Sequence, residues 1–120
     1  MTLVINEKLP NLNDYTKACR SNKFVGASMK KKYERIISCY IEQQLNGVSF
    51  KNKVKLSFRW YEKDKRRDLD NICFSKKFLL DALVSNNIIE TDGWKGVVGF
   101  TDEFFIDKSG YRVEVDIEEV

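Results

Sequence analysis

The sequence predicts an α+β protein in which two main helices pack on a small mixed β-sheet. Residues 53–61 alternate between apolar and polar side chains, which is the pattern of a half-buried strand. Residues 28–46 instead repeat their apolar positions every 3.6 residues, as an amphipathic helix does. The chain then closes with two consecutive strand-like segments, and this order of elements is typical of the α+β class.

Length and composition predict one domain over residues 1–120. The chain has 120 residues, of which 42% are hydrophobic and 32% charged, enough for a single modest core. No apolar run spans a membrane, and the start lacks the features of a signal peptide. The three cysteines form no C-x-x-C pair, so we expect reduced thiols in a cytoplasmic protein.

The first half is expected to contain a strand, two helical segments and a second strand. Residues 3–6 open as a strand, and a loop at 9–13 leads to a short polar helix or loop. The amphipathic helix runs from Ser28 to the stop signal Asn46-Gly47. The strand at 53–61 has an apolar face and a basic face, the latter formed by Lys53, Lys55 and Arg59.

The second half is expected to contain one helix and a hairpin. The charged run 62–67 predicts a loop. A single helix is predicted from Asn71 to about Ser85, ending at Asn86-Asn87. Residues 97–106 and 111–120 are expected to pair as a hairpin that turns at 107–110.

Charge and the absence of histidine restrict the chemistry. Residues 1–60 carry twelve Lys and Arg against four Asp and Glu, although the net charge is only +3. Such a basic half is typical of nucleic-acid binding, and solvated helix faces explain it equally well. With no histidine, triads, histidine-ligated zinc and HNH centres are excluded. Oxygen ligands then favour magnesium or manganese.

The most informative segment is Lys65-Arg66-Arg67-Asp68-Leu69-Asp70-Asn71. In an extended segment, carboxylates two residues apart point to one side, and three adjacent cations suit a polyanion. This pattern predicts a hard divalent cation held beside a phosphate backbone, as in a metal-dependent nuclease. The alternative is that Asp70 or Asn71 caps a helix, which explains one acid but not the pair.

Further candidates follow along the chain. Glu90 and Asp92 lie in the turn after the predicted helix, where either can return towards the acid pair as a third ligand. Asp81 lies in the middle of the helix and is expected to pair with a cation or to lie at the edge of the site. Lys76 and Lys77 lie about two turns after Asp70, so one of them can orient water or neutralise phosphate charge.

These motifs resemble the RusA-type Holliday junction resolvases over nearly the whole length. The matching landmarks are the block 66–71, the spacing Lys77-x-x-x-Asp81, an aspartate turn before a valine-rich strand, the Pro10 and Asn13-Asp14-Tyr15 start, and the closing segment 112–115. The resemblance implies a RusA-like fold and a magnesium-dependent homodimer that nicks two opposed strands of four-way DNA symmetrically, with roles in DNA recombination and repair.

Carried over by position, the resemblance implies catalytic and metal-binding acids at Asp68, Asp70 and Asp92, and a catalytic lysine at Lys77. It also implies DNA-binding residues at Lys65, Arg66, Arg67, Asn71, Lys76 and Asn13. The segment between Asp70 and Asp81 is about one turn longer than the family pattern, so Lys76 competes with Lys77. Asp14 stands where the family has a basic residue, and Glu90 competes with Asp92.

Three rival functions remain open. A restriction-type nuclease is weakened because no Asp or Glu is followed two residues later by lysine. A non-catalytic DNA- or RNA-binding module using the basic N-terminal half predicts binding without a magnesium requirement and no cleavage. A small structural protein predicts no preference for branched DNA. The resemblance favours the resolvase, and it leaves open the sequence cut and the host or phage process served.

Overall fold

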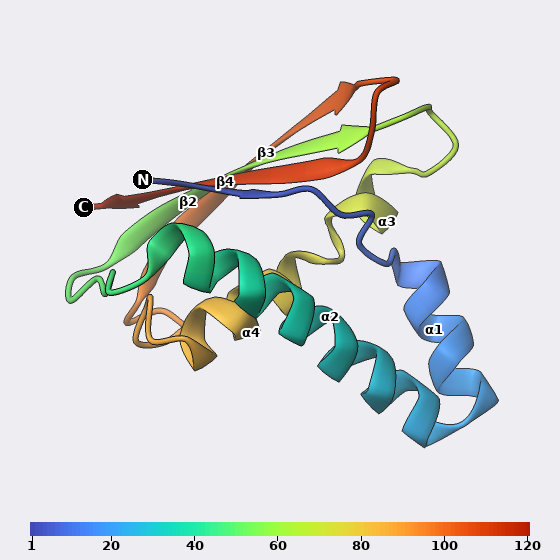
Figure 1. Cartoon of the computed structure of the whole chain (residues 1–120), viewed down its shortest axis with the longest axis horizontal. Helices are drawn as coiled ribbons and strands as arrows, with labels where there is room; N and C mark the ends of the chain where they lie inside the picture. The colour runs from blue at the N-terminus through green and yellow to red at the C-terminus, as the bar shows by residue number, and fades with distance from the viewer.

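The computed structural model describes residues 1–120 and confirms the α+β class (Figure 1). Four strands form one mixed sheet, and the longer helices lie together on one side of it. None of the helices has the length and apolar character needed to cross a membrane. In chain order the elements are β1 (Thr2–Ile5), α1 (Leu12–Ser21), α2 (Lys23–Leu45), β2 (Val54–Glu62), α3 (Leu69–Cys73), α4 (Lys76–Ser85), β3 (Val97–Ile106) and β4 (Arg112–Glu119).

The sheet has the strand order β1-β4-β2-β3, so the predicted hairpin between residues 97–106 and 111–120 is wrong. β2 lies between these two strands, antiparallel to β4 and parallel to β3. The chain passes the end of β2 as it leaves β3, and the Asp107 N–H donates to the Glu62 carbonyl at 2.7 Å. β2 takes this central place because alternate positions along its whole length are buried.

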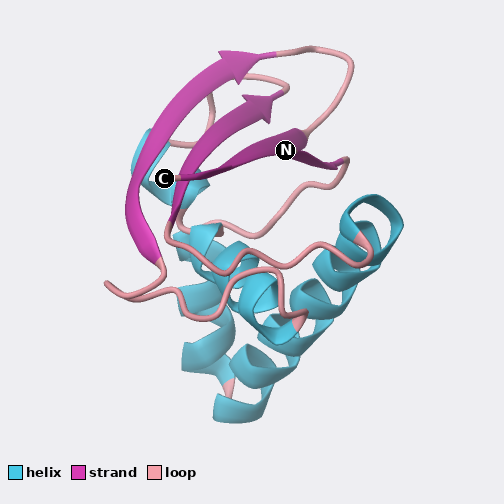
Figure 2. Cartoon of the chain, turned by 90° about the vertical axis from the view of Figure 1, so that its left-hand side faces the viewer, coloured by secondary structure: helices cyan, strands magenta, loops and turns pink.

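The helices cover one face of the sheet and leave the other to solvent (Figure 2). Leu56 and Phe58 of β2 are fully buried, as are Ile37 and Ile41 of α2 and Leu79 of α4. The predicted alternation of β2 is therefore confirmed on its apolar face. Its other face is not simply basic, since Arg59 pairs with acids of β4.

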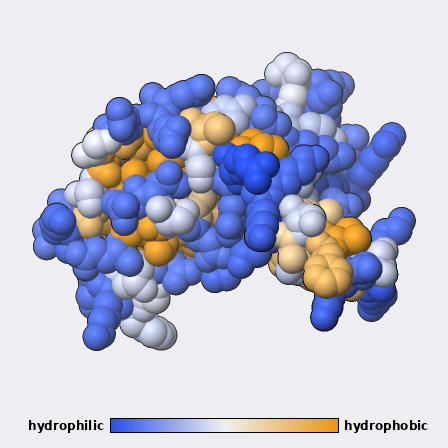
Figure 3. All heavy atoms as spheres, turned by 60° about the horizontal axis from the view of Figure 1, so that its bottom comes forward, coloured by the Kyte–Doolittle hydropathy of each residue, from blue (hydrophilic) through white to orange (hydrophobic).

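The N-terminal helices extend further than predicted. Asn11 begins α1 through a capping box with Asp14, so most of the segment expected to be a loop or helix is helical. α2 begins at Lys23, where the Asn22 side chain accepts the Phe24 N–H at 2.8 Å. Figure 3, which brings the helical side forward, shows apolar side chains gathered in two areas among hydrophilic ones, one over the left half of the view and a smaller one at its lower right.

The single helix predicted over residues 71–85 is divided into α3 and α4. The break is at Phe74-Ser75, where Ser75 is fully buried and its hydroxyl donates to the Pro10 carbonyl. The Phe74 ring packs on Tyr15 of α1, with 5.4 Å between ring centroids. These contacts with the N-terminal segment fix the break, which the local helical pattern does not reveal. α4 ends as predicted, with Asn87 in the left-handed region at φ 59°.

Candidate active site

Asp68 and Asp70 lie at the start of α3, directly after the loop that leaves β2. Asp68 occupies the N-cap position with an extended backbone, but its side chain makes no capping bond. Asp70 is in the first turn, where its Oδ1 accepts the N–H of Asn71 at 3.0 Å. Both acids are exposed and neither forms an ion pair. Two neighbouring carboxylates without a cation suit a hard divalent ion as their partner.

The third predicted ligand, Asp92, lies on the loop between α4 and β3. The structure brings no three acidic or thiol side chains into a group that holds a metal ion, so the predicted set of Asp68, Asp70 and Asp92 is not gathered. The donor chemistry of Asp68 and Asp70 fits magnesium, since both offer free carboxylate oxygens. Asp92 is in contact with Lys77, and Glu90 is exposed.

Lys77 connects α4 to the Asp92 loop. Its Nζ lies 3.0 Å from Oδ1 of Asp81 and 3.3 Å from Oδ2 of Asp92. Asp81 also lies 3.4 Å from Nζ of Lys30 on α2, as expected for an acid in the middle of a helix that pairs with cations. The hydrogen bond to Asp81, followed by that to Asp92, raises the pKa of Lys77, so this side chain remains an ammonium at neutral pH.

Lys76 faces the other way, towards the sheet. Its Nζ lies 2.6 Å from Oδ2 of Asp102 on β3, and 5.1 Å and 4.7 Å from the ring centroids of Phe58 and Phe100. The other oxygen of Asp102 accepts the Trp60 Nε1–H at 2.9 Å. The sequence did not predict Asp102 as the partner of Lys76. The available signal was its position two residues after Phe100, which places an acid on the apolar face of a strand.

The cationic run before Asp68 is divided between surface and interior. The side chain of Arg66 is 89% exposed, and Lys65 is exposed as well. Arg67 is only 13% exposed and binds Glu62 through two bonds of 2.8 Å and 2.9 Å. Because Glu62 is buried at the end of β2, it needs this partner, and Arg67 faces inward instead of towards DNA.

The remaining predicted DNA-binding residues are Asn71 and Asn13. Asn71 is half-buried beside Asp70 on α3, within the acid segment itself. Asn13 is exposed on α1, which is a separate element from the acid segment. The structure therefore keeps Asn71 with the predicted site and leaves Asn13 on a different surface.

A cavity of about 360 Å³ opens beside Asp68. It lies between the loop after β2, α3 and the end of β3, and its apolar part includes Leu69, Ile72 and Phe104. Its charged lining residues are Glu62, Asp64, Lys65, Arg67 and Asp68. A concave site lined by both apolar and charged side chains is a typical place for part of a ligand to bind. Asp68 is thus exposed at the edge of a concave surface, while Asp70 does not line it.

Together the fold and the site place two exposed carboxylates beside exposed cations on a small α+β fold. The sequence matches the family model of Endodeoxyribonuclease RusA over residues 8–118, and the chain belongs to that family. It is an endonuclease of the Holliday junction resolvase type, and nucleases of this family are generally metal-dependent. No curated protein matches the chain.

Proposed function

We propose that this chain resolves four-way DNA junctions by symmetric paired nicking, as a magnesium-dependent homodimer. The observation that carries the proposal is the pair of exposed acids, Asp68 and Asp70, which lack a cation partner although Lys65 and Arg66 lie close by in the chain. Exposed carboxylates without an internal cationic partner are available to a ligand. Family membership supports a metal ion together with a DNA phosphate as that ligand.

The three acids Asp68, Asp70 and Asp92 would hold magnesium, or manganese in its place. The bound ion supplies activation of water and stabilisation of charge on the scissile phosphate. Lys77 is proposed as the catalytic lysine, since it contacts Asp92 and remains positively charged. In this role it orients the Asp92 carboxylate and offers positive charge to the phosphate.

DNA contacts are proposed for Lys65, Arg66, Asn71, Lys76 and Asn13. Lys65 and Arg66 are exposed directly before the acids, so they suit the phosphates on either side of the cut. For Arg67 the buried pair with Glu62 supports an indirect contribution, in which it fixes the end of this loop. Phosphate contacts carry no sequence information, so these residues bind the backbone whatever the sequence.

The homodimer is supported by the exposed apolar surface of β3. This strand lies at the edge of the sheet, and its exposed large side chains include Val98, Phe100, Phe105 and Ile106. Trp94, just before the strand, is 92% exposed. Exposed apolar side chains on an edge strand are typical of an interface. Two identical sites would match the two-fold symmetry of a four-way junction.

We further propose that residues 1–120 act as one cytoplasmic endonuclease domain in DNA recombination and repair. The basic N-terminal half would also support a binding module without catalysis, since it carries Lys30, Lys31 and Lys32 on α2. Cleavage separates the two functions, because a binding module does not require free carboxylates.

The deciding experiment is cleavage of a labelled four-way junction beside a linear duplex of the same sequence. Wild type is expected to make paired symmetric nicks in the junction alone, only when magnesium is present. Asp70→Asn should abolish the nicks, and Asp92→Asn should do so while Glu90→Gln does not. Binding without cutting under any metal condition would favour the binding module. Equal cutting of the linear duplex would indicate a different nuclease class.

A further inference from the structure

Three segments that are distant in sequence meet at one end of the sheet. Lys63 is the first residue after β2, and Tyr111 is the last residue before β4. β2 and β4 are antiparallel, with Tyr61 opposite Arg112, so the end of β2 and the start of β4 lie side by side. Lys8 lies in the segment that follows β1, which also ends beside the start of β4. Lys8, Lys63 and Tyr111 therefore come together from different parts of the chain.

The two lysines approach the same aromatic ring. Nζ of Lys8 lies 4.9 Å from the centroid of the Tyr111 ring, and Nζ of Lys63 lies 5.6 Å from it. Both lysines are exposed, whereas Tyr111 is half-buried. An ammonium over an aromatic ring is attracted by the negative face of the ring. The ring thus holds two exposed positive charges near each other.

Arg67 fixes the backbone beside both lysines. Its Nη1 donates to the Leu9 carbonyl at 3.0 Å, and its guanidinium forms two bonds with Glu62. Leu9 directly follows Lys8, and Glu62 directly precedes Lys63. One largely buried arginine therefore holds the chain neighbours of the two lysines in place.

The same arginine connects the Tyr111 ring to the acid segment. Cζ of Arg67 lies 5.9 Å from the ring centroid, and Asp68 is the next residue in the chain. A DNA strand advances by about 3.4 Å per nucleotide along the helix axis. A strand bound at Asp68 can therefore reach the two lysines within a few nucleotides.

The two lysines have no acidic partner within the chain. Neither Lys8 nor Lys63 forms an ion pair. The acids of the neighbouring segments each have a different polar partner, and these acids are Glu7, Glu62, Asp64 and Asp107. Exposed cations without an internal partner are available to an anionic ligand.

We propose that Lys8, Lys63 and the Tyr111 ring form a phosphate-binding patch, which holds the backbone of the DNA strand that passes through the cleavage site. The proposal rests on the proposed function for its substrate, and it adds a contact outside the acid segment. Lysine binds phosphate as a point charge and reads no base. In the alternative, both lysines are solvated charges whose stems only cover the ring.

The salt dependence of junction binding tests this patch. Affinity is measured without magnesium, from about 50 to 200 mM salt, for wild type, Lys8→Gln, Lys63→Gln and the double variant. Each single change should weaken binding about fivefold and lower the slope of log affinity against log salt by about 1, and the double change by about 2. Lys51→Gln is the matched control, since this exposed lysine precedes β2 whereas Lys63 follows it. The control should bind within about twofold of wild type.

Tyr111→Leu removes the ring and leaves both charges. It should weaken binding about threefold with an unchanged salt slope, while Tyr111→Phe, which keeps the ring, should bind like wild type. With magnesium and saturating junction, the single-turnover cleavage rate of the lysine variants should stay within about twofold of wild type. A larger loss of that rate would overturn a role in binding alone.

The outcomes separate this proposal from the proposed function. If the lysine variants bind no more weakly than Lys51→Gln while wild type cuts the junction normally, the patch alone is overturned. If wild type cuts nothing but loses affinity and salt slope with Lys8→Gln and Lys63→Gln, the patch is supported and the resolvase function fails. If wild type does not bind the junction, both proposals are overturned.

Discussion

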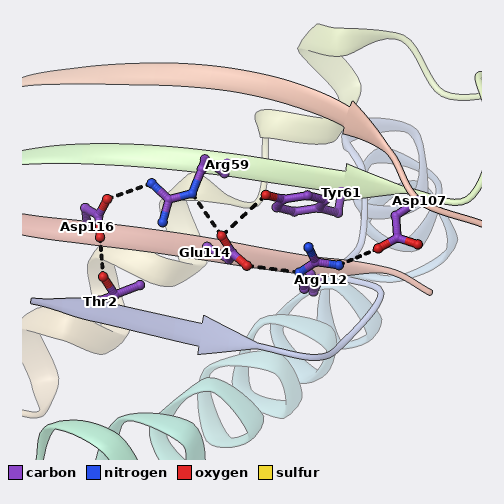
Figure 4. Close-up of polar contacts among 7 residues, drawn as sticks. All are labelled: Thr2, Arg59, Tyr61, Asp107, Arg112, Glu114 and Asp116. Atoms are coloured by element: carbon purple, nitrogen blue, oxygen red, sulfur yellow. Dashed lines mark hydrogen bonds and ion pairs between the residues drawn. The ribbon is translucent and has the colours of Figure 1, made fainter. Parts of the chain in front are cut away.

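The acids on the solvent-facing side of the sheet are paired with arginines, whereas the acids at the start of α3 have no cationic partner. On the sheet, Arg59 donates to Asp116 at 2.6 Å and to Glu114 at 2.9 Å (Figure 4). Arg112 continues the chain, donating to Glu114 at 3.0 Å and to Asp107 at 2.7 Å. Each charged side chain in this network has a partner of opposite charge, either on the same sheet or at Asp107 in the turn between β3 and β4.

At the start of α3, Asp68 and Asp70 have no such partner. The cations needed to match them are present in the preceding loop, but Arg66 contacts Asp64 and Arg67 contacts Glu62. Charges that the fold balances internally serve stability, whereas charges left unbalanced are available to a ligand. The following experiments test whether the two regions divide in this way.

The largest effect is expected for Asp70→Asn. We expect junction cleavage to fall by about 10³-fold or more, because a metal-binding carboxylate is lost. The free energy of unfolding should stay the same or rise slightly, since one of two repelling carboxylates is removed. Cleavage assays and urea unfolding measure the two quantities. A clear loss of stability would contradict the comparison, because it would give Asp70 a structural role.

The next largest effect is expected for Glu62→Gln. This change removes the charge that matches Arg67 in a pair whose side chains are 8% and 13% exposed. Leaving Arg67 buried and unmatched should lower the free energy of unfolding by about 3 kcal/mol. Urea unfolding would measure the loss, with the exposed Glu90→Gln as control. An unchanged midpoint would mean that water reaches the guanidinium.

A smaller effect is expected for Arg59→Met in the sheet network. Glu114 would then keep only Arg112 as a cationic partner and Asp116 would lose its ion pair, so the free energy of unfolding should fall by about 2 kcal/mol. The cleavage rate of the folded protein should not change, which is the opposite of the result expected for Asp70→Asn. Lys55→Met, on the same face of β2, is the matched control, because Lys55 makes no ion pair. A loss of cleavage in folded Arg59→Met would contradict the comparison, because it would show that the sheet network also contributes to cleavage.

The smallest effect is expected in the pH dependence of stability. Hydrogen bonds from Ser109 and Arg112 lower the pKa of Asp107 from 3.8 to about 2, and Arg59 lowers the pKa values of Glu114 and Asp116. Because folding depresses these pKa values, their contribution is complete above about pH 5 and is lost as the pH falls towards 2. Melting temperatures from pH 6 to pH 2 should show this loss, and Arg59→Met should show less of it.

Parts of the fold could be predicted because their signals are local. The alternation of residues 54–60 and the helical period of residues 29–45 each report burial on one face, and both elements are present. The prediction of a hairpin was wrong. Turn residues 107–110 suggest that β3 and β4 are adjacent, but the pairing of strands depends on which strand is most deeply buried. The break at Ser75 depends on the Pro10 carbonyl, which is distant in sequence.

The candidate site was predicted only in part, for a related reason. The acid pair and its cations are contiguous in the chain, so their exposure at the start of α3 followed from the pattern. The partners of the two lysines could not be predicted from the pattern. Lys76 and Lys77 are adjacent in sequence, but Lys76 faces β3 and Lys77 faces the Asp92 loop. Arg67 and Glu62 form a buried pair because β2 ends with an acid below the surface. Such tertiary partners cannot be read from spacing alone.

The position of β1 affects how the protein is made. β1 pairs with β4, with Thr2 opposite Asp116, and the Met1 amino group donates to the Ile117 carbonyl at 3.1 Å. During synthesis the first strand therefore has no edge to join until the last strand has left the ribosome. A growing chain cannot complete its sheet before then, and long-range pairing of this kind is slow to form.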